Sequence, residues 1–230
     1  MKSTQNIALL VFAYSPEEEK KHKPFLRKGG LANSLDNHIH EITKKSCLPV
    51  IYFDEHLQIG HNFNARFANA FAQTFSQGYD AIISIGNDSP GLNAHHIFEA
   101  EEALRNGRTV LGPSFDGGLY LVGISKENFD YHQFSNFSWG SAFLFEEFKE
   151  KYQSAHYNCL ILEKIADIDQ LLDLGNLSLT NINNARLRSI ILSIKAWVAN
   201  ISSDIQIKTL EKVLSITPNK GSPLCLAFNQ

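Results

Sequence analysis

Apolar positions along this chain follow two patterns, short continuous runs and longer stretches with helical spacing. Runs of strand length are followed by segments in which apolar residues recur every three or four positions. This alternation is typical of a mostly parallel β-sheet covered by helices. The predicted strands are Ile7–Tyr14, Pro49–Phe53, the run from Ile82 that ends at Asp88, Thr109–Leu111, Leu119–Val122 and Leu160–Ile165.

Capping residues and glycines mark the expected helix ends. An aromatic stripe at helical spacing predicts a helix over Asn64–Gln77 that packs on the sheet and ends at Gly78. Asn93 is expected to cap a helix over Ala94–Asn106. Further helices are expected before the second strand, within Phe137–Tyr152, at Leu171–Leu174, over Ala185–Ile201 and over Ile205–Leu214, followed by the tail Thr217–Gln230.

The composition sets the scale of the fold. The chain has 230 residues, 43% of them apolar, enough for one large domain with a proper core and a short appendage. We expect an α/β domain over residues 1–178 and a helical carboxyl-terminal extension with a tail over 179–230. The apolar helix of this extension packs on the domain or forms a homodimer; the sequence leaves both open.

Charge and cysteine content narrow the function classes. The 21 Lys and Arg against 24 Asp and Glu give a net charge of −3, which provides no general field for nucleic acids or acidic membranes. Cys47, Cys159 and Cys225 lack the paired spacing of zinc or redox motifs and are expected to be reduced thiols. The amino-terminal apolar run of about eight residues is too short for a signal peptide or a membrane span. We therefore expect a cytoplasmic protein.

The segment that contains Asp88 is the strongest candidate for a functional site. In open α/β sheets, ligands bind beyond the carboxyl ends of the strands, where Gly86 permits close backbone approach and Asp88 offers a carboxylate. Mg²⁺ and Mn²⁺ prefer oxygen ligands, and one or two carboxylates suffice when substrate phosphates and waters complete the shell. Asp88 is therefore a candidate metal or nucleotide ligand. Alternatively, it caps the turn at Ser89–Pro90 or the following helix.

Two further acidic segments are candidates. Asp167 and Asp169 lie two residues apart, so in an extended segment their carboxylates face the same side, and one is a candidate second metal ligand. Asp169 equally suits the N-cap of the next helix. Asp116, beside Gly117 and Gly118, is a candidate to line an acceptor pocket and to orient or deprotonate an acceptor hydroxyl. The alternative for this segment is a simple hairpin turn.

Aromatic and basic residues supply weaker candidates. Trp139 and Tyr120 offer flat faces for a base or sugar, but both equally suit a core. Arg66 lies on the first turn of a predicted helix, where an anion also meets the positive helix end; a surface position is the alternative. The histidines lack zinc-site spacing, and no nucleophile elbow, Walker loop or dinucleotide fingerprint is present.

Several of these segments together carry a family resemblance. The segments are Gln58–Phe67, Ile85–Leu92, Leu111–Gly123, Trp139–Ser141 and Asp167–Asp169. In order and spacing, over roughly residues 5 to 175, the chain resembles the bacterial radical-SAM/selenodomain-associated glycosyltransferases. These are small GT-A-fold proteins related to nucleotide-sugar glycosyltransferases and to the nucleotidyltransferases of cofactor biosynthesis. The resemblance implies a three-layer α/β/α fold with a mostly parallel mixed sheet, nucleotide contacts that include Gly86 and Asn87, and a divalent metal ion.

One loop departs from the family pattern. Many members carry a basic Pro-Gly-Arg-Val-Lys-Thr-Arg-Leu-like loop after the first strand, which suits a diphosphate. Here Glu17–Lys23 and Arg27–Gly30 stand in its place. Lys20, Lys23 and Arg27 are candidate phosphate ligands, and the alternative for each is a position in a solvated mixed-charge loop.

These observations lead to one functional prediction and one rival. The predicted function is a transferase dependent on Mg²⁺ or Mn²⁺ that moves a glycosyl or nucleotidyl group from a nucleotide-sugar or nucleoside triphosphate to a small-molecule acceptor. The rival is a non-catalytic, degenerate GT-A-fold protein that serves as a binding or scaffold protein, and the altered basic loop is its main support.

Overall fold

A six-stranded mixed sheet forms the centre of the molecule. The computed structural model describes residues 5–153 and 158–214, with side chains to residue 200; the predicted tail and Cys225 lie outside this part. The strand order is β2-β1-β3-β5-β4-β6. The strands are β1 (Ile7–Phe12), β2 (Val50–Phe53), β3 (Ala81–Ile85), β4 (Thr109–Pro113), β5 (Leu119–Ser125) and β6 (Cys159–Ile161).

Five of these strands point the same way. Strand β1 pairs in parallel with β2 and β3, and β4 pairs in parallel with β6, whereas β5 runs antiparallel between β3 and β4. The chain passes from β1 to β2 on one side and then to β3 on the other side of β1. The topological switch point therefore lies between β1 and β3, where open sheets bind ligands.

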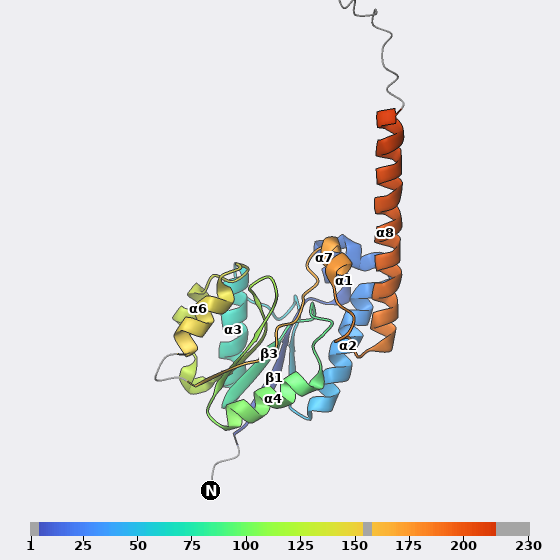
Figure 1. The fold of residues 1–230 in the computed structure, drawn as a ribbon. Helices are drawn as coiled ribbons and strands as arrows, with labels where there is room; N and C mark the ends of the chain where they lie inside the picture. The colour runs from blue at the N-terminus through green and yellow to red at the C-terminus, as the bar shows by residue number, and fades with distance from the viewer. Residues whose placement is uncertain (1–4, 154–157, 215–230) are drawn as a thin grey trace, which may run out of the picture.

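Helices cover both faces of the sheet (Figure 1). Alternate residues of β1 show why, because Ile7, Leu9 and Val11 join one apolar cluster and Leu10 and Phe12 join the other. The first cluster includes residues of α2 (Leu31–Ser46) and α4 (Ala94–Arg105); the second includes residues of α3 (Phe63–Ser76), α5 (Tyr131–Asn136) and α6 (Leu144–Tyr152). The expected three-layer α/β/α fold is confirmed.

A third apolar cluster fixes the start of the carboxyl-terminal helix. Residues Leu187, Ile191 and Ile194 of α8 (Ala185–Leu214) pack with Leu31 and other residues of α2 and α7 (Leu171–Asn176). Farther along, α8 extends away from the body of the molecule (Figure 1). No helix in the described ranges is long and apolar enough to cross a membrane.

One helix prediction differs from the structure and another is confirmed. One continuous α8 replaces the two helices expected over Ala185–Ile201 and Ile205–Leu214, because no glycine or proline interrupts the sequence between them. The helix expected within Phe137–Tyr152 is confirmed as α6, which begins at Leu144. Residues 137–143 before it form a turn-rich segment in which the Trp139 indole N–H donates to the Phe134 carbonyl oxygen at 2.8 Å.

Candidate functional site

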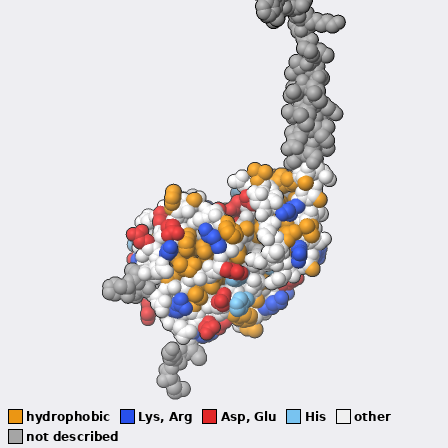
Figure 2. Space-filling view, in the orientation of Figure 1, with side chains coloured by type: hydrophobic (Ala, Val, Ile, Leu, Met, Phe, Trp, Pro, Cys, Tyr) orange, Lys and Arg blue, Asp and Glu red, His pale blue; other side chains and the backbone are white. Residues whose placement is uncertain are grey.

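A cavity of about 260 Å³ lies beside the switch point, where β1 and β3 end. Its walls include residues from the ends of both strands, the β4–β5 turn and the segment before α7. The predicted site residues that line it are Gly86, Asp88, Asp116, Gly118, Trp139, Asp167 and Asp169. In the space-filling view, the upper edge of the body is notched between the parts that carry α6 and α7, and acidic side chains lie at this notch (Figure 2).

Aromatic rings form one side of the cavity. Phe67 and Trp139 meet edge to face with ring centroids 4.8 Å apart, and Phe63 lies 5.8 Å from Trp139. Phe67 is 6% exposed, whereas Phe63 is 42% exposed. Trp139 thus packs on core rings, which is the core position the sequence left open, and it also lines the cavity; its contact with a base or sugar stays a prediction.

The Asp116 turn closes the neighbouring wall. The Asp116 carboxylate accepts hydrogen bonds from the Ser114 hydroxyl and, at 3.0 Å, from the Gly118 backbone N–H. Gly117 has a φ of 93°, and a Cβ added there would lie 2.1 Å from the Ala142 carbonyl oxygen. The hairpin turn and the cavity position of Asp116 therefore coexist, because the carboxylate that stabilises the turn also borders the cavity.

The opposite side of the cavity is acidic and holds one lysine. The Lys23 ammonium lies 3.0 Å from Asp88 Oδ1 and 2.8 Å from Asp169 Oδ1, and it donates to the Ile168 carbonyl oxygen at 3.3 Å. Burial alone would lower the pKa of Lys23, but the charge of Asp88 and the bond to Asp169 raise it above its ordinary value. Burial raises the pKa of Asp88, and Lys23 opposes that shift. Lys23 therefore neutralises much of this acidic wall.

The helix-capping alternatives do not describe these two aspartates. Helix α4 is capped by Asn93, whose side chain accepts from the His95 backbone N–H at 2.9 Å, so Asp88 is not its cap. The N-cap of α7 is Gln170, and the Asp169 backbone N–H donates to Asp173. Both carboxylates point instead to Lys23.

Two further acids near this wall have raised pKa values. Asp167 accepts a hydrogen bond from the Ser89 hydroxyl, and burial raises the pKa of Asp167 to about 6. Glu19, which the sequence analysis did not single out, is 7% exposed, and its Oε2 has no hydrogen-bond partner among the described residues. Burial and then the charge of Asp88 raise the pKa of Glu19 to about 7. Its position inside a run of charged residues concealed its burial.

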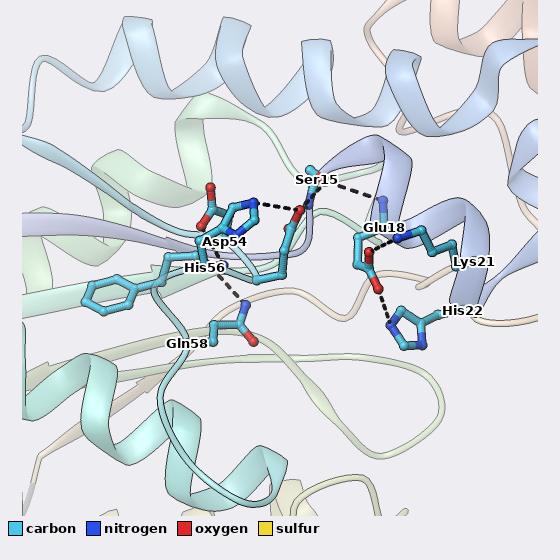
Figure 3. Close-up of polar contacts among 9 residues, drawn as sticks. Ser15, Glu18, Lys21, His22, Asp54, His56 and Gln58 are labelled. Carbon is cyan, nitrogen blue, oxygen red and sulfur yellow. Dashed lines mark hydrogen bonds and ion pairs between the residues drawn. The ribbon is translucent and has the colours of Figure 1, made fainter.

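The charged segment after β1, expected to be a loop, forms helix α1 (Pro16–His22), and most of its charges are paired locally. Ser15 caps α1, and the Glu55 carboxylate accepts from the Ser15 backbone N–H at 2.8 Å and from its hydroxyl at 2.6 Å. Farther along α1, Glu18 pairs with Lys21 and His22 (Figure 3). Of the two predicted lysines, Lys23 contacts the acidic residues of the cavity, whereas Lys20 pairs with Glu17.

Besides Arg27, five predicted residues lie outside the cavity lining of the described chain, and one of them, Lys23, meets it only through its contacts with Asp88 and Asp169. Lys20 pairs with Glu17 at 3.3 Å. Arg66 donates from its guanidinium to the Tyr14 hydroxyl at 3.2 Å. Asn87 is buried, and Gly117 lies in the β4–β5 turn with its Cα against the Ala142 backbone.

A second, larger cavity adjoins the first. Its volume is about 490 Å³, and it shares Asp116, Asp167 and Asp169 with the smaller cavity. The rest of its lining includes Phe115, Lys164 and hydroxyl or amide side chains of the segment after α7. The three shared carboxylates therefore stand between two chambers.

The family resemblance implies a divalent metal ion, so the acidic side chains of the cavity can be compared with the ligands that such an ion needs. Within residues 5–153 and 158–214, no group of three or more His, Cys, Asp or Glu side chains is placed to hold a metal ion. Two carboxylate oxygens, from Asp88 and Asp169, converge on one cation position, which the Lys23 ammonium fills. Two carboxylates are enough for a Mg²⁺ site completed by phosphates and waters. A divalent ion would take this position only after Lys23 leaves it, so metal binding by Asp88 and Asp169 stays a prediction.

Comparisons with known proteins agree with the fold. A family model described as "Uncharacterized protein conserved in bacteria (DUF2064)" matches residues 48–141. No curated protein matches the chain. The crystal structure of a proposed nucleotide-diphospho-sugar transferase from Desulfovibrio desulfuricans G20 is 24% identical, with a TM-score of 0.67 over 86% of this chain and 98% of that chain. At 24% identity this likeness shows the fold alone, a GT-A-like fold.

Two more distant structures resemble the chain only weakly. Rv0371c from Mycobacterium tuberculosis H37Rv, in complex with manganese, is 10% identical, with a TM-score of 0.44 over 75% of this chain and 98% of that chain. A glycosyltransferase involved in glycosylation of the major capsid of PBCV-1 is 8% identical, with a TM-score of 0.39 over 68% of this chain and 82% of that chain. At these TM-scores neither structure carries an argument about this protein.

Proposed function

We propose that the smaller cavity binds a nucleotide or nucleotide-sugar and that the protein transfers a glycosyl or nucleotidyl group to a small-molecule acceptor. One observation carries the proposal: Asp88, Asp116, Asp167 and Asp169, from three separate segments, meet at one cavity where β1 and β3 end. Ligands of open α/β sheets bind at this place in the fold. The closer relation to radical-SAM/selenodomain-associated proteins stays a prediction.

The cavity walls suggest a division of roles. The rings of Phe63 and Trp139 offer faces for the base or the sugar, and Gly86 leaves its side of the cavity open because a Cβ there would meet nothing within 4 Å. The larger chamber is proposed to hold the acceptor. Asp116 lies between the chambers, where its carboxylate would orient an acceptor hydroxyl or take its proton.

The charge of the cavity calls for a cation. A diphosphate that approaches Asp88, Asp167 and Asp169 meets like charges at close range, and such repulsion is strong away from bulk water. Mg²⁺ or Mn²⁺, when bound by Asp88 and Asp169, would neutralise the charge that develops on the leaving phosphate. The residues of the chain supply the two carboxylates and the shape of the chamber.

The non-catalytic alternative has one observation in its favour. Lys23 already neutralises Asp88 and Asp169, and most other charges of its segment are paired among themselves. A degenerate binding protein would keep the cavity and lose turnover. Consumption of the donor with an acceptor present, compared between the wild type and Asp116→Asn, separates the two functions: a transferase consumes the donor and Asp116→Asn slows it.

A thermal-shift panel tests the binding proposal. The ligands are UDP-, GDP-, CDP- and dTDP-sugars and the four nucleoside triphosphates, each with and without Mn²⁺ or Mg²⁺, because ligand binding to the native state raises its stability. We expect one nucleotide to raise the unfolding temperature of the wild type when metal is present, and Asp88→Asn to abolish that shift.

Asp80 provides the matched control. It directly precedes β3, at the opposite end of the strand from Asp88, where its carboxylate accepts from the Asn6 backbone N–H at 2.8 Å. Asp80→Asn should keep the nucleotide shift. No shift with any ligand, or an equal shift in Asp88→Asn and the wild type, would refute the proposal.

A further inference from the structure

We propose that the Lys23 ammonium is an internal counter-ion that a divalent metal ion displaces from Asp88 and Asp169. The freed ammonium then becomes available to the phosphates of the incoming nucleotide. The second step rests on the proposed function, whereas the displacement itself involves the metal ion alone. Lys23 is in this view the counter-ion of the two carboxylates before the metal ion binds and a phosphate ligand afterwards.

The geometry of Lys23 is that of a cation held in a ligand shell. Three oxygens surround its Nζ, those of Asp88, Asp169 and the Ile168 carbonyl group, at 2.8 to 3.3 Å. The two carboxylates approach from different segments, one after β3 and one before α7. A metal ion held by these two carboxylates would compete with the ammonium for the same oxygens.

The backbone at Lys23 permits the side chain to move alone. The Lys23 N–H donates to the Glu19 carbonyl oxygen at 2.7 Å, and Pro24 follows with its restricted φ angle. The ammonium sits on a flexible four-carbon stem. Displacement of the ammonium would therefore need rotation of the side chain alone, with the backbone bond to Glu19 kept.

The charge around Lys23 favours a divalent ion over the single ammonium. Besides Asp88 and Asp169, the carboxyl group of Glu19 lies in the same field, since the charges of Asp88, Lys23 and Asp169 all act on it. Glu19 is only 7% exposed, and its Oε2 has no hydrogen-bond partner among the described residues. A buried oxygen without a donor is costly, and the waters of a hydrated metal ion are donors that could reach it.

Displacement couples the two binding events. While Lys23 is bound to Asp88 and Asp169, it opposes metal binding; once released, it adds a positive charge for the phosphates. The same side chain thus weakens binding of the metal ion alone and strengthens binding of the nucleotide with metal. These opposite effects distinguish a displaceable counter-ion from a lysine that only stabilises the fold.

Binding of Mn²⁺ alone tests the displacement. The free Mn²⁺ concentration is followed by electron paramagnetic resonance in titrations of the wild type, Lys23→Met and Lys20→Met. Lys20→Met is the matched control, because it removes the same charge from the same segment but from a residue paired with Glu17. We expect Lys23→Met to bind Mn²⁺ about tenfold more tightly than the wild type, since removal of one adjacent charge is worth at least about 1.4 kcal/mol at this range. Lys20→Met should change the affinity less than about twofold.

Two further measurements complete the test. Addition of Asp88→Asn to Lys23→Met should remove the gain in Mn²⁺ affinity. With saturating Mn²⁺, Lys23→Met should bind the nucleotide found in the thermal-shift panel more weakly than Lys20→Met. An Mn²⁺ affinity of Lys23→Met equal to or below that of the wild type would overturn the proposal. A gain in Mn²⁺ affinity with no nucleotide bound by any variant would refute the proposed function and leave the displacement supported.

Amine labelling of the wild type gives an answer that needs no variant. Acetic anhydride reacts with free ammonium groups after loss of a proton, and mass spectrometry reports the labelling of Lys23 relative to Lys20. Mn²⁺ should raise the relative labelling of Lys23 several-fold, because the carboxylates no longer hold its proton. Equal labelling with and without Mn²⁺ would contradict displacement.

Discussion

The two sides of the cavity are held in place by different forces. The aromatic side consists of rings packed into a core, as the contacts of Phe67 with Phe71 and Trp139 show. The acidic side is held by charge, through Lys23 between Asp88 and Asp169. Packing is expected to fix the shape of the aromatic side regardless of pH or ions, whereas the acidic side should respond to protons and metal ions. The cavity thus combines a rigid wall with a switchable one.

The largest stability effect should come from the aromatic side. Phe67→Ala removes a ring that is 6% exposed, and large-to-small changes of this kind cost about 3–5 kcal/mol in free energy of unfolding. Phe63→Ala, on the same helix and the same cavity wall but 42% exposed, should cost about 1 kcal/mol or less. Urea unfolding of both variants measures the difference. Equal losses would show that the aromatic side is not held by burial.

The Asp116 turn should be nearly as sensitive. Gly117→Ala combines a φ of 93° with a Cβ placed 2.1 Å from the Ala142 carbonyl oxygen, so the turn or the 137–143 segment must shift, at a cost of about 3 kcal/mol. Gly140→Ala also has a positive φ, of 80°, but its Cβ meets nothing within 4 Å, so about 1 kcal/mol is expected. Thermal unfolding of Gly117→Ala and Gly140→Ala measures both losses of stability, and equal losses would contradict this account.

The acidic side should show a pH effect through Glu19. Its pKa is about 7 in the folded protein against 4.5 ordinarily, so the folded state binds more protons than the unfolded state between these values. Stability therefore falls as the pH rises from about 4.5 to 7 and stays lower above that range. The side chain introduced by Glu19→Gln cannot ionise. At pH 8 the free energy of unfolding of this variant should therefore exceed that of the wild type by about 1–3 kcal/mol, and at pH 4.5 the two should differ little.

Denaturant unfolding of wild type and Glu19→Gln at both pH values checks the sign. The pKa of Asp167 is raised to about 6, so its ionisation also lowers the stability of both proteins as the pH rises. This contribution is the same in both and cancels in the comparison. A difference between the two proteins that is the same at pH 4.5 and pH 8 would show that folding does not raise the pKa of Glu19 and would contradict this prediction.

The same contrast explains how much could be predicted from the sequence. The aromatic stripe of α3 and the Asn93 cap depend on neighbours within a few turns, so spacing alone revealed them. The position of Asp88 followed from the rule that ligands bind at strand ends. Lys23 and Asp169 are 146 residues apart, and no local pattern joins them. Their pairing depends on the folded sheet, as does the burial of Glu19.

The central claim is that the cavity binds a nucleotide through Asp88, and calorimetric titration tests it most directly. The nucleotide selected by the thermal-shift panel is titrated, with Mn²⁺ present, into the wild type, Asp88→Asn and Asp80→Asn. We predict that Asp88→Asn weakens binding about tenfold or more and that Asp80→Asn leaves it within about twofold, since loss of one charge-assisted contact is worth at least about 1.4 kcal/mol. Equal affinities in the wild type and Asp88→Asn would contradict the account.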